Sequence, residues 1–206
     1  MKNLLNIGTR RWLGLLIGNI CIGMGVGIFK LSGLGNDPFS AMALSMIAIL
    51  NIRYSTFLLL INIGLFLIEF LLGQKFVGVG TFANWFFVGY VVEFTIWLGS
   101  TYVPEPSSLM LRILYVAIGV LIVSTGLSLY QTSNAGIAPF DSMALILDDR
   151  LSKVPYFWCR MIIDGICALI CLFTGGLLGF GTFVSVFCLG PIVHFLNNKV
   201  SQKLIY

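Results

Sequence analysis

Arg160 and Asp164 are two of the few ionisable residues that lie inside apolar runs of this sequence. A charge at membrane depth costs about 3 kcal/mol or more, so it needs a partner or a functional role. A spacing of four places both side chains on one face of a helix, where they can neutralise each other. The spacing favours an ion pair, and contact with a substrate is the alternative. Glu69, near the end of its own run, is expected to reach the membrane interface.

Glu93 and His194, the only histidine, form a second candidate pair. A carboxylate and an imidazole that lie close together can relay a proton. Both residues are also within a turn or two of predicted helix ends, where their side chains can extend to the interface instead. The two residues are therefore interpreted either as intramembrane polar residues or as a proton relay.

Two Gly/Pro breaks interrupt the apolar runs, because GLGNDPFSAMAL at 33–44 recurs as NAGIAPFDSMAL at 134–145. Non-helical backbone is tolerated at membrane depth only where protein buries it or where it lines a wet cavity. The breaks therefore predict a binding site between them. Its candidate substrate-binding residues are Gly35, Asn36, Asp37, Pro38, Ser40, Gly136, Pro139 and Asp141.

Each break is followed by a short apolar helix, predicted over 38–50 and 139–147. Proline suits a first helical turn, and Asp37 is a competent N-cap. The free N–H groups of two such helix N-termini favour an anionic group or a polar headgroup as ligand. For Asp37 and Asp141, capping of their own helices is the alternative to substrate contact. About nine residues from Pro139 cannot span a ~30 Å core, so the short helices are re-entrant or interfacial, although an eight-crossing arrangement stays open.

The composition is that of a membrane protein, with 58% hydrophobic residues, 10% charged residues and a mean hydropathy of +1.00. No long polar stretch leaves room for a soluble domain, so residues 1–206 form a single membrane domain. Apolar runs long enough for one helical crossing each are found at 12–29, 54–72, 76–98, 113–130, 156–174 and 177–196. The net charge of +4 comes from flanks and short loops and indicates topology rather than nucleic-acid binding.

The chain is a duplication, because an ungapped shift of 101 residues aligns 12–94 with 113–195 and gives 23 identities in 83 positions. The predicted fold is therefore an all-α integral membrane protein with six transmembrane helices in two three-helix halves. Three crossings per half is an odd number, so the halves form an inverted repeat. The positive-inside rule favours the cytoplasmic membrane with both termini in the cytoplasm, since the 100–111 loop carries no basic residue before Arg112.

Enzymatic, metal and cofactor chemistry find no support in the residue patterns. The sequence holds no H-E-x-x-H, G-x-S-x-G or P-loop motif. GVGTF (78–82) and GFGTF (179–183) lack a nearby lysine and indicate close helix packing. The five cysteines form no C-x-x-C pair and are expected to pack as small apolar residues. We expect no enzyme, no metal and no cofactor.

The paired GxxPFxxMAL elements and the six-run layout resemble the YczE/YitT-like bacterial membrane proteins over about residues 10–198. The matching residues are Gly35, Pro38, Phe39, Met42, Gly136, Pro139, Phe140 and Met143. The resemblance implies a bacterial protein of the cytoplasmic membrane and supplies no substrate.

The sequence leaves two candidate functions open. The first is a transporter or permease for an unknown small molecule or ion, with its site between the breaks. The alternative is an accessory protein that stabilises or positions a partner through small-residue helix faces. A polar central cavity bounded by 35–40 and 136–141 favours the first, and a dry centre favours the second. The expected partners are the lipid bilayer and either a homo-oligomer or a membrane partner protein.

Overall fold

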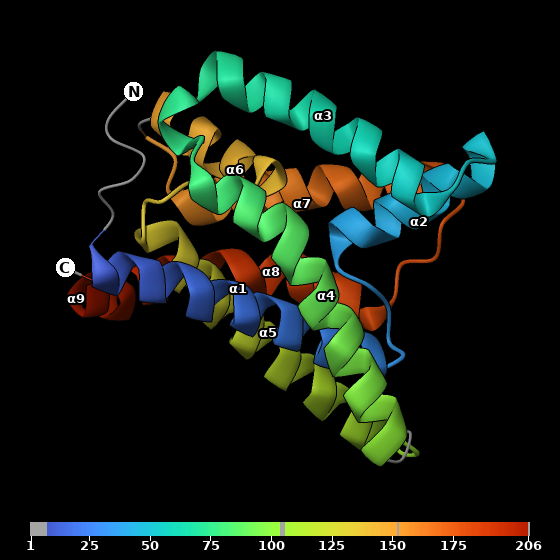
Figure 1. Ribbon diagram of the computed structural model, residues 1–206. Coiled ribbons are helices and arrows are strands. Elements are labelled where there is room, and N and C mark those ends of the chain that lie inside the picture. The colour runs from blue at the N-terminus through green and yellow to red at the C-terminus, as the bar shows by residue number, and fades with distance from the viewer. Residues whose placement is uncertain (1–7, 104–105, 152, 206) are drawn as a thin grey trace.

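The protein is described by a computed structural model over residues 8–103, 106–151 and 153–205, and all regular structure in these ranges is helical (Figure 1). The helices are α1 (Thr9–Leu31), α2 (Pro38–Leu50), α3 (Tyr54–Leu72), α4 (Val79–Tyr102), α5 (Leu109–Thr132), α6 (Pro139–Arg150), α7 (Tyr156–Phe173), α8 (Phe180–Leu196) and α9 (Gln202–Ile205). A 3₁₀ turn, η1 (Gln74–Phe76), precedes α4, and a π-helical segment, η2 (Asn197–Ser201), follows α8. Residues 104 and 105 of the 100–111 loop lie outside the described residues.

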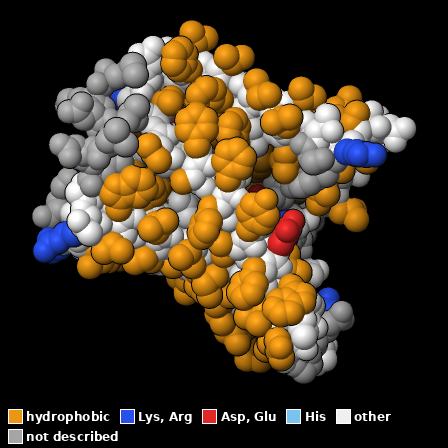
Figure 2. Space-filling view, in the orientation of Figure 1, with side chains coloured by type: hydrophobic (Ala, Val, Ile, Leu, Met, Phe, Trp, Pro, Cys, Tyr) orange, Lys and Arg blue, Asp and Glu red, His pale blue; other side chains and the backbone are white. Residues whose placement is uncertain are grey.

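Within the described residues, five helical stretches are long and apolar enough to cross a membrane: α1, α4, α5, α7 and the continuous Phe180–Ile205. The all-α membrane fold is thereby confirmed. The sixth predicted crossing is α3, whose stretch Thr56–Leu72 is shorter than the ~20 residues that a perpendicular crossing needs. Large hydrophobic side chains cover the face formed by α3 and α4 (Figure 2), as expected of a surface that contacts lipid.

α1 and α5 form the centre of the bundle and run antiparallel (Figure 1). Glycines on the two helices face each other where the backbones cross. A Cβ on Gly18 would lie 2.8 Å from the carbonyl oxygen of Gly126, and a Cβ on Gly25 would lie 2.9 Å from that of Gly119. Small residues that permit such close approach are the usual basis of helix association in lipid. The glycine repeat of the sequence therefore creates this contact.

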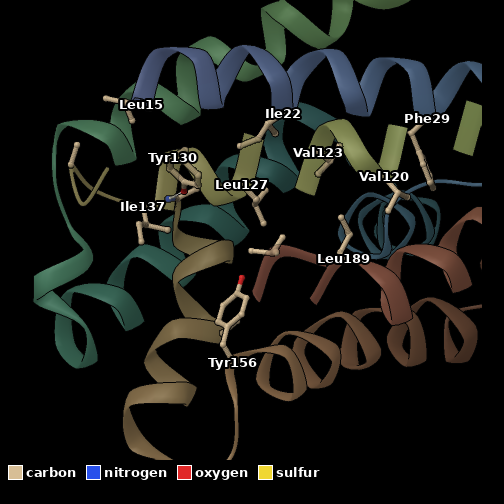
Figure 3. Packing of buried hydrophobic residues seen from close by; sticks show 14 of the residues in the cluster. Leu15, Ile22, Phe29, Val120, Val123, Leu127, Tyr130, Ile137, Tyr156 and Leu189 are labelled. Atoms are coloured by element: carbon tan, nitrogen blue, oxygen red, sulfur yellow. Dashed lines mark hydrogen bonds between the residues drawn. The ribbon is translucent and has the colours of Figure 1, made fainter. Parts of the chain in front are cut away.

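Larger apolar side chains fill the space beside these glycines (Figure 3). They come from both central helices and are fully or nearly fully buried: Leu15, Ile22 and Phe29 of α1 and Val116, Val120, Val123, Leu127 and Tyr130 of α5. α4 packs on α1, and α8 packs on α5 and α7. The central pair thus provides the rigid base against which the other helices are positioned.

The second half of the chain repeats the helix starts of the first half with a nearly constant offset of 100 to 102 residues. The starts in the first half are Thr9, Pro38, Tyr54 and Val79, and those in the second are Leu109, Pro139, Tyr156 and Phe180.

α2 and α6 are half-length helices whose N-terminal ends meet inside the bundle. The rings of Phe39 and Phe140 are in contact, with centroids 4.5 Å apart. From this contact the two helices extend toward opposite ends of the bundle (Figure 1). With 13 and 12 residues, each is about 20 Å long at ~1.5 Å per residue, too short for a ~30 Å core.

α6 continues beyond Leu147, where the apolar segment was predicted to end, and stops at Arg150. Asp149 in this last turn forms an ion pair with Lys75. Arg150 lies at the helix C-terminus, where a positive charge is favourable. The charged residues therefore extend the helix instead of ending it.

Packing at Gly18 is tested by its replacement with alanine. The new Cβ would lie 2.7 Å from Tyr130 Cβ and 2.8 Å from the Gly126 carbonyl oxygen, so the helices must separate. We expect a loss of about 1–3 kcal/mol, seen as a lower melting temperature of the purified chain in detergent. Gly165→Ala is the matched control, since nothing lies within 4 Å of its Cβ and alanine suits a helix interior. Equal melting temperatures for the two variants would contradict the packing described.

Candidate functional site

The first break, between α1 and α2, packs against the N-terminus of α8, with residues 34–37 half-buried. Gly35 has a φ of +122°, a backbone conformation that glycine adopts readily. Gly181 N–H donates to the Leu34 carbonyl at 2.9 Å, and the Thr182 hydroxyl donates to the Asn36 carbonyl at 2.7 Å. The second half of the chain therefore supplies hydrogen bonds to the break in the first half.

The second break, between α5 and α6, makes the reciprocal contacts with the N-terminus of α4. Gly136 has a φ of +116°. Gly80 N–H donates to the Ala135 carbonyl at 2.8 Å, and the Thr81 hydroxyl donates to the Ile137 carbonyl at 2.8 Å. GVGTF and GFGTF do pack closely, as predicted, but they pack on the breaks. Sequence reasoning missed Thr81 and Thr182, although both recur at the repeat spacing.

The N-terminus of α2 is capped as the sequence predicts. The Asp37 carboxylate accepts a hydrogen bond from Ser40 N–H at 3.0 Å. Asp37 is half-buried and is also a charged neighbour of Asp164. The partial positive charge of this helix end is therefore neutralised within the protein.

The N-terminus of α6 has no side-chain cap of its own, since Ala138 stands where α2 has Asp37. The buried Tyr130 hydroxyl accepts a hydrogen bond from Ala138 N–H and lies 3.5 Å from Asp141 Oδ2. Asp141 lies in the first turn of α6, where a negative charge is favourable. Tyr130 and Asp141 together perform the capping role.

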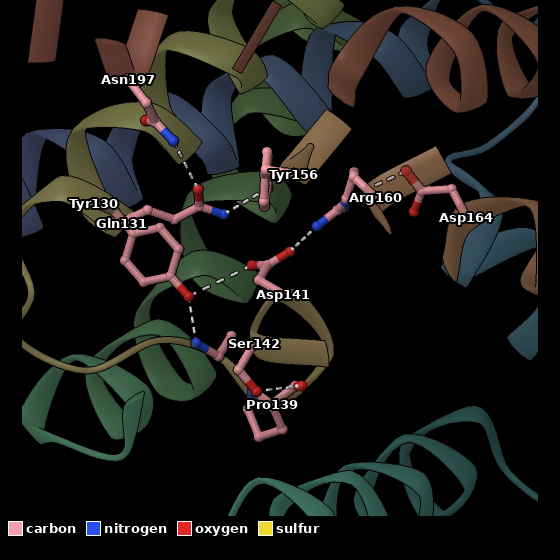
Figure 4. Close-up of polar contacts among 10 residues, drawn as sticks. Tyr130, Gln131, Pro139, Asp141, Ser142, Tyr156, Arg160, Asp164 and Asn197 are labelled. Atoms are coloured by element: carbon pink, nitrogen blue, oxygen red, sulfur yellow. Dashed lines mark hydrogen bonds and ion pairs between the residues drawn. The ribbon is translucent and has the colours of Figure 1, made fainter. Parts of the chain in front are cut away.

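Asp141, Arg160 and Asp164 form a carboxylate–guanidinium–carboxylate triad between α6 and α7 (Figure 4). Arg160 Nη1 lies 2.7 Å from Asp141 Oδ1, and Arg160 Nε lies 3.0 Å from Asp164 Oδ2. All three side chains are buried. The guanidinium also lies over the ring of Phe140, 5.1 Å from its centroid. The ion pair predicted between Arg160 and Asp164 is confirmed, and its extension to Asp141 required the fold.

A second polar chain borders the triad in Figure 4. Gln131 Nε2 donates to the Tyr156 hydroxyl at 3.0 Å, and Asn197 Nδ2 donates to Gln131 Oε1 at 3.3 Å. Side chains from α5, α7 and η2 are thereby joined.

The site contains more acidic groups than basic ones. Asp164 Oδ1 has no hydrogen-bond partner among the described residues. Glu69 was expected to reach the interface, which is wrong, because it is 0% exposed and neither carboxyl oxygen has a partner in the described part of the chain. α3 packs on α6, and this contact encloses Glu69 near Asp141. The guanidinium of Arg160 is thus outnumbered in this region by four carboxyl groups, those of Asp37, Glu69, Asp141 and Asp164.

Glu93 and His194 are not brought together. Glu93 is exposed on α4. His194 is half-buried on α8, with its ring 5.9 Å from that of Phe157 and its Nε2 3.2 Å from Asn198 Nδ2. No hydrogen bond or ion pair joins the two residues, so the structure gives a direct relay between them no support.

A cavity of about 320 Å³ lies at the end of the bundle where α1 and α4 end and α5 begins, and Ser32 and Gly33 at the start of the first break are among its lining residues. Lys30, Ser100 and Arg112 are among its lining residues, and Arg112 Nε donates to the Pro106 carbonyl at 3.0 Å. Between the breaks themselves, the Phe39 and Phe140 rings are in contact. The predicted site is therefore polar on the Arg160 side and closed where the two half-length helices meet.

Comparison with known proteins places the chain in a family. A family model described as a family of unknown function (DUF6198) matches residues 9–198. The chain belongs to this family. An uncharacterized protein of Haemophilus influenzae is 27% identical over 192 residues, which covers 91% of this chain and 84% of that protein.

Two Bacillus subtilis proteins also match. The uncharacterized protein YyaS is 26% identical, with 89% of this chain and 94% of YyaS covered. The uncharacterized membrane protein YczE is 22% identical, with 95% of this chain and 89% of YczE covered. No solved structure matches. The resemblance to a YczE-like family is confirmed, and it agrees with the helices in showing a membrane protein.

The triad predicts that the stability of the folded protein depends strongly on the balance of charges among Asp141, Arg160 and Asp164. Arg160→Met leaves Asp141 and Asp164 buried without a counter-charge, which typically costs about 3–5 kcal/mol. We expect the variant to melt well below the wild type in detergent. Adding Asp141→Asn and Asp164→Asn should recover most of the loss, because the uncompensated charges are then removed. A triple variant no more stable than Arg160→Met would show that the guanidinium acts through packing instead.

Proposed function

We propose that this protein is a small transporter whose site lies between the two breaks, beside the Asp141–Arg160–Asp164 triad. The observation that supports it most directly is the burial of this charged triad at the start of a half-length helix. Such groups are expensive at membrane depth and are characteristic of substrate and ion pathways. Discontinuous helices that meet inside the bundle are the usual setting for transporter sites.

The transporter is proposed to be an inverted repeat of 12–94 and 113–195, with both termini in the cytoplasm. Three observations support this. α1 and α5 are repeat counterparts and run antiparallel. Phe39 and Phe140 occupy the same repeat position and contact each other, as residues beside a pseudo-twofold axis do. The bonds from Thr81 to Ile137 and from Thr182 to Asn36 are also counterparts.

The proposed movement is a rocking of one repeat against the other, with the Phe39–Phe140 contact as the closure. Separation of these rings would expose the helix N-termini and the triad to water. The Gly/Thr contacts at the breaks hold each half to the other and are suited to act as pivots. The closed centre described above is then one state of an alternating-access cycle.

The charge balance of the site alters the expected substrate. The free helix N-termini led us to expect an anionic ligand, but Asp37 caps one of them, and Tyr130 with Asp141 caps the other. The remaining carboxyl groups outnumber the guanidinium. The site therefore favours a cationic substrate or a coupling cation, and transport without covalent chemistry.

A second candidate function is binding of a partner protein through α4. Its outer face carries the exposed aromatic side chains Phe86, Tyr90, Phe94 and Trp97, and Glu93 lies exposed on the same helix. A carboxyl group at the lipid surface is costly unless a partner covers it. In this case Glu93→Leu would release a co-purifying membrane partner, whereas under the transport proposal it would leave movement of the breaks unchanged.

Topology is tested with Asn51→Cys and Leu151→Cys, each placed in a chain whose five native cysteines are replaced by alanine. These residues follow α2 and α6, so an inverted repeat places them on opposite membrane faces. We expect an impermeant maleimide to label one from outside intact cells and the other only in inverted vesicles. Labelling of both from the same side would overturn the inverted repeat and the proposed transporter.

Alternating access is tested with Asn36→Cys and Ile137→Cys in the same cysteine-free background. Under rocking, each thiol reacts from one face only, and a crosslinker that joins Phe39→Cys to Phe140→Cys should suppress both reactions. We expect at least a tenfold fall in labelling rate on crosslinking. Gly8→Cys, at an exposed position beyond the bundle, should keep its rate and serves as the control. Unchanged rates at all three positions would exclude rocking at the breaks.

A further inference from the structure

Glu69 is a carboxyl group enclosed by helices on all sides. It lies in the last turn of α3, yet its exposed fraction is 0%. Neither carboxyl oxygen has a hydrogen-bond partner among the described residues. Its repeat counterpart is Ile170 of α7, so an ionisable group stands where the other half of the chain has an aliphatic one.

The neighbours of Glu69 offer it no positive charge. On α6, the Ser142 side chain lies close enough to interact with Glu69, although its hydroxyl donates to the Pro139 carbonyl at 2.9 Å, and the charged neighbour of Glu69 is Asp141. Tyr130 of α5 also lies within electrostatic reach and is engaged with α6. α2 also packs on α3 and has no ionisable residue between Pro38 and Leu50, and α4 contacts α3 through the rings of Phe82 and Trp85.

Two basic residues on neighbouring elements, Arg160 and Lys75, are paired with other carboxylates. Arg160 donates to Asp141 and Asp164 through Nη1 and Nε. Lys75 of η1, which follows α3, is paired with Asp149 at the end of α6. An ionised Glu69 would therefore be a buried charge without a counter-ion, with Asp141 opposing it. Such a charge costs far more than a neutral carboxylic acid in the same place.

We propose that Glu69 carries an exchangeable proton, bound in this closed state and released when α6 moves away from α3. This inference rests on the proposed transport function and names its coupling ion. On opening, water reaches the side chain, and the neutral acid transfers its proton to water to give a carboxylate and a hydronium ion. Glu69 thus couples the position of α6 to the membrane proton gradient.

Infrared difference spectroscopy of the full chain in liposomes tests the bound proton directly and requires no substrate. The wild type should show the C=O stretching band of a protonated carboxylic acid in the apolar interior. Glu69→Gln should remove this band, and Glu69→Asp should shift it, which provides a second measurement if one variant folds poorly. Asp149→Glu alters an exposed carboxylate while it keeps a partner for Lys75, and it should leave the band intact. A band that survives Glu69→Gln unchanged, or no band in the wild type, would overturn the proposal.

Coupling to opening is tested with Phe39→Cys and Phe140→Cys joined by a short thiol crosslinker. While the chain is held closed, the Glu69 band should resist both D₂O exchange and a rise in bulk pH. Removal of the crosslink should make it exchange at least tenfold faster. Equal exchange in both states would refute the coupling. Failure of the transport proposal itself would be seen in the separate labelling experiment described above. There the maleimide reaction of Asn36→Cys and Ile137→Cys would be the same with and without the crosslink.

Discussion

The requirement that every peptide group in a membrane find a hydrogen-bond partner determines how this chain is assembled. Each Gly/Pro break leaves carbonyl groups outside any helix. Gly181 and Thr182 donate to the Leu34 and Asn36 carbonyls of the first break. Gly80 and Thr81 donate to the Ala135 and Ile137 carbonyls of the second. Neither half of the chain supplies these particular donors to its own break, so the two halves must fold together.

The backbone is nearly symmetric, whereas the charges are not. The triad residues Asp141, Arg160 and Asp164 have Ser40, Leu59 and Ile63 as repeat counterparts. Duplication thus supplies the scaffold of two opposed half-length helices, and substitution in one copy supplies the chemistry. This division explains why the glycine, proline and phenylalanine positions of the breaks match between the halves while the triad positions do not.

Much of this arrangement can be predicted from sequence because periodicity and helix chemistry are local. The duplication predicted from the 101-residue register agrees with the helix starts, and the Asp37 cap and the Arg160–Asp164 pair follow from spacing alone. Glu69 and Tyr130 could not be assigned in this way, because their roles depend on which helices pack beside them. Glu69 lies near a helix end, which normally allows escape to water, and only the packing of α6 on α3 prevents it.

The charge asymmetry also affects how the two half-length helices are held. α2 packs on α7 more extensively than on α3, and Arg160 joins α6 to α7 through its ion pair with Asp141. The equivalent interface between α2 and α3 has no ion pair among the described residues. Separation of α6 from α7 would leave Arg160 or Asp141 without its counter-charge, so the opening proposed above, in which α6 moves away from α3, is expected to carry α6 and α7 together.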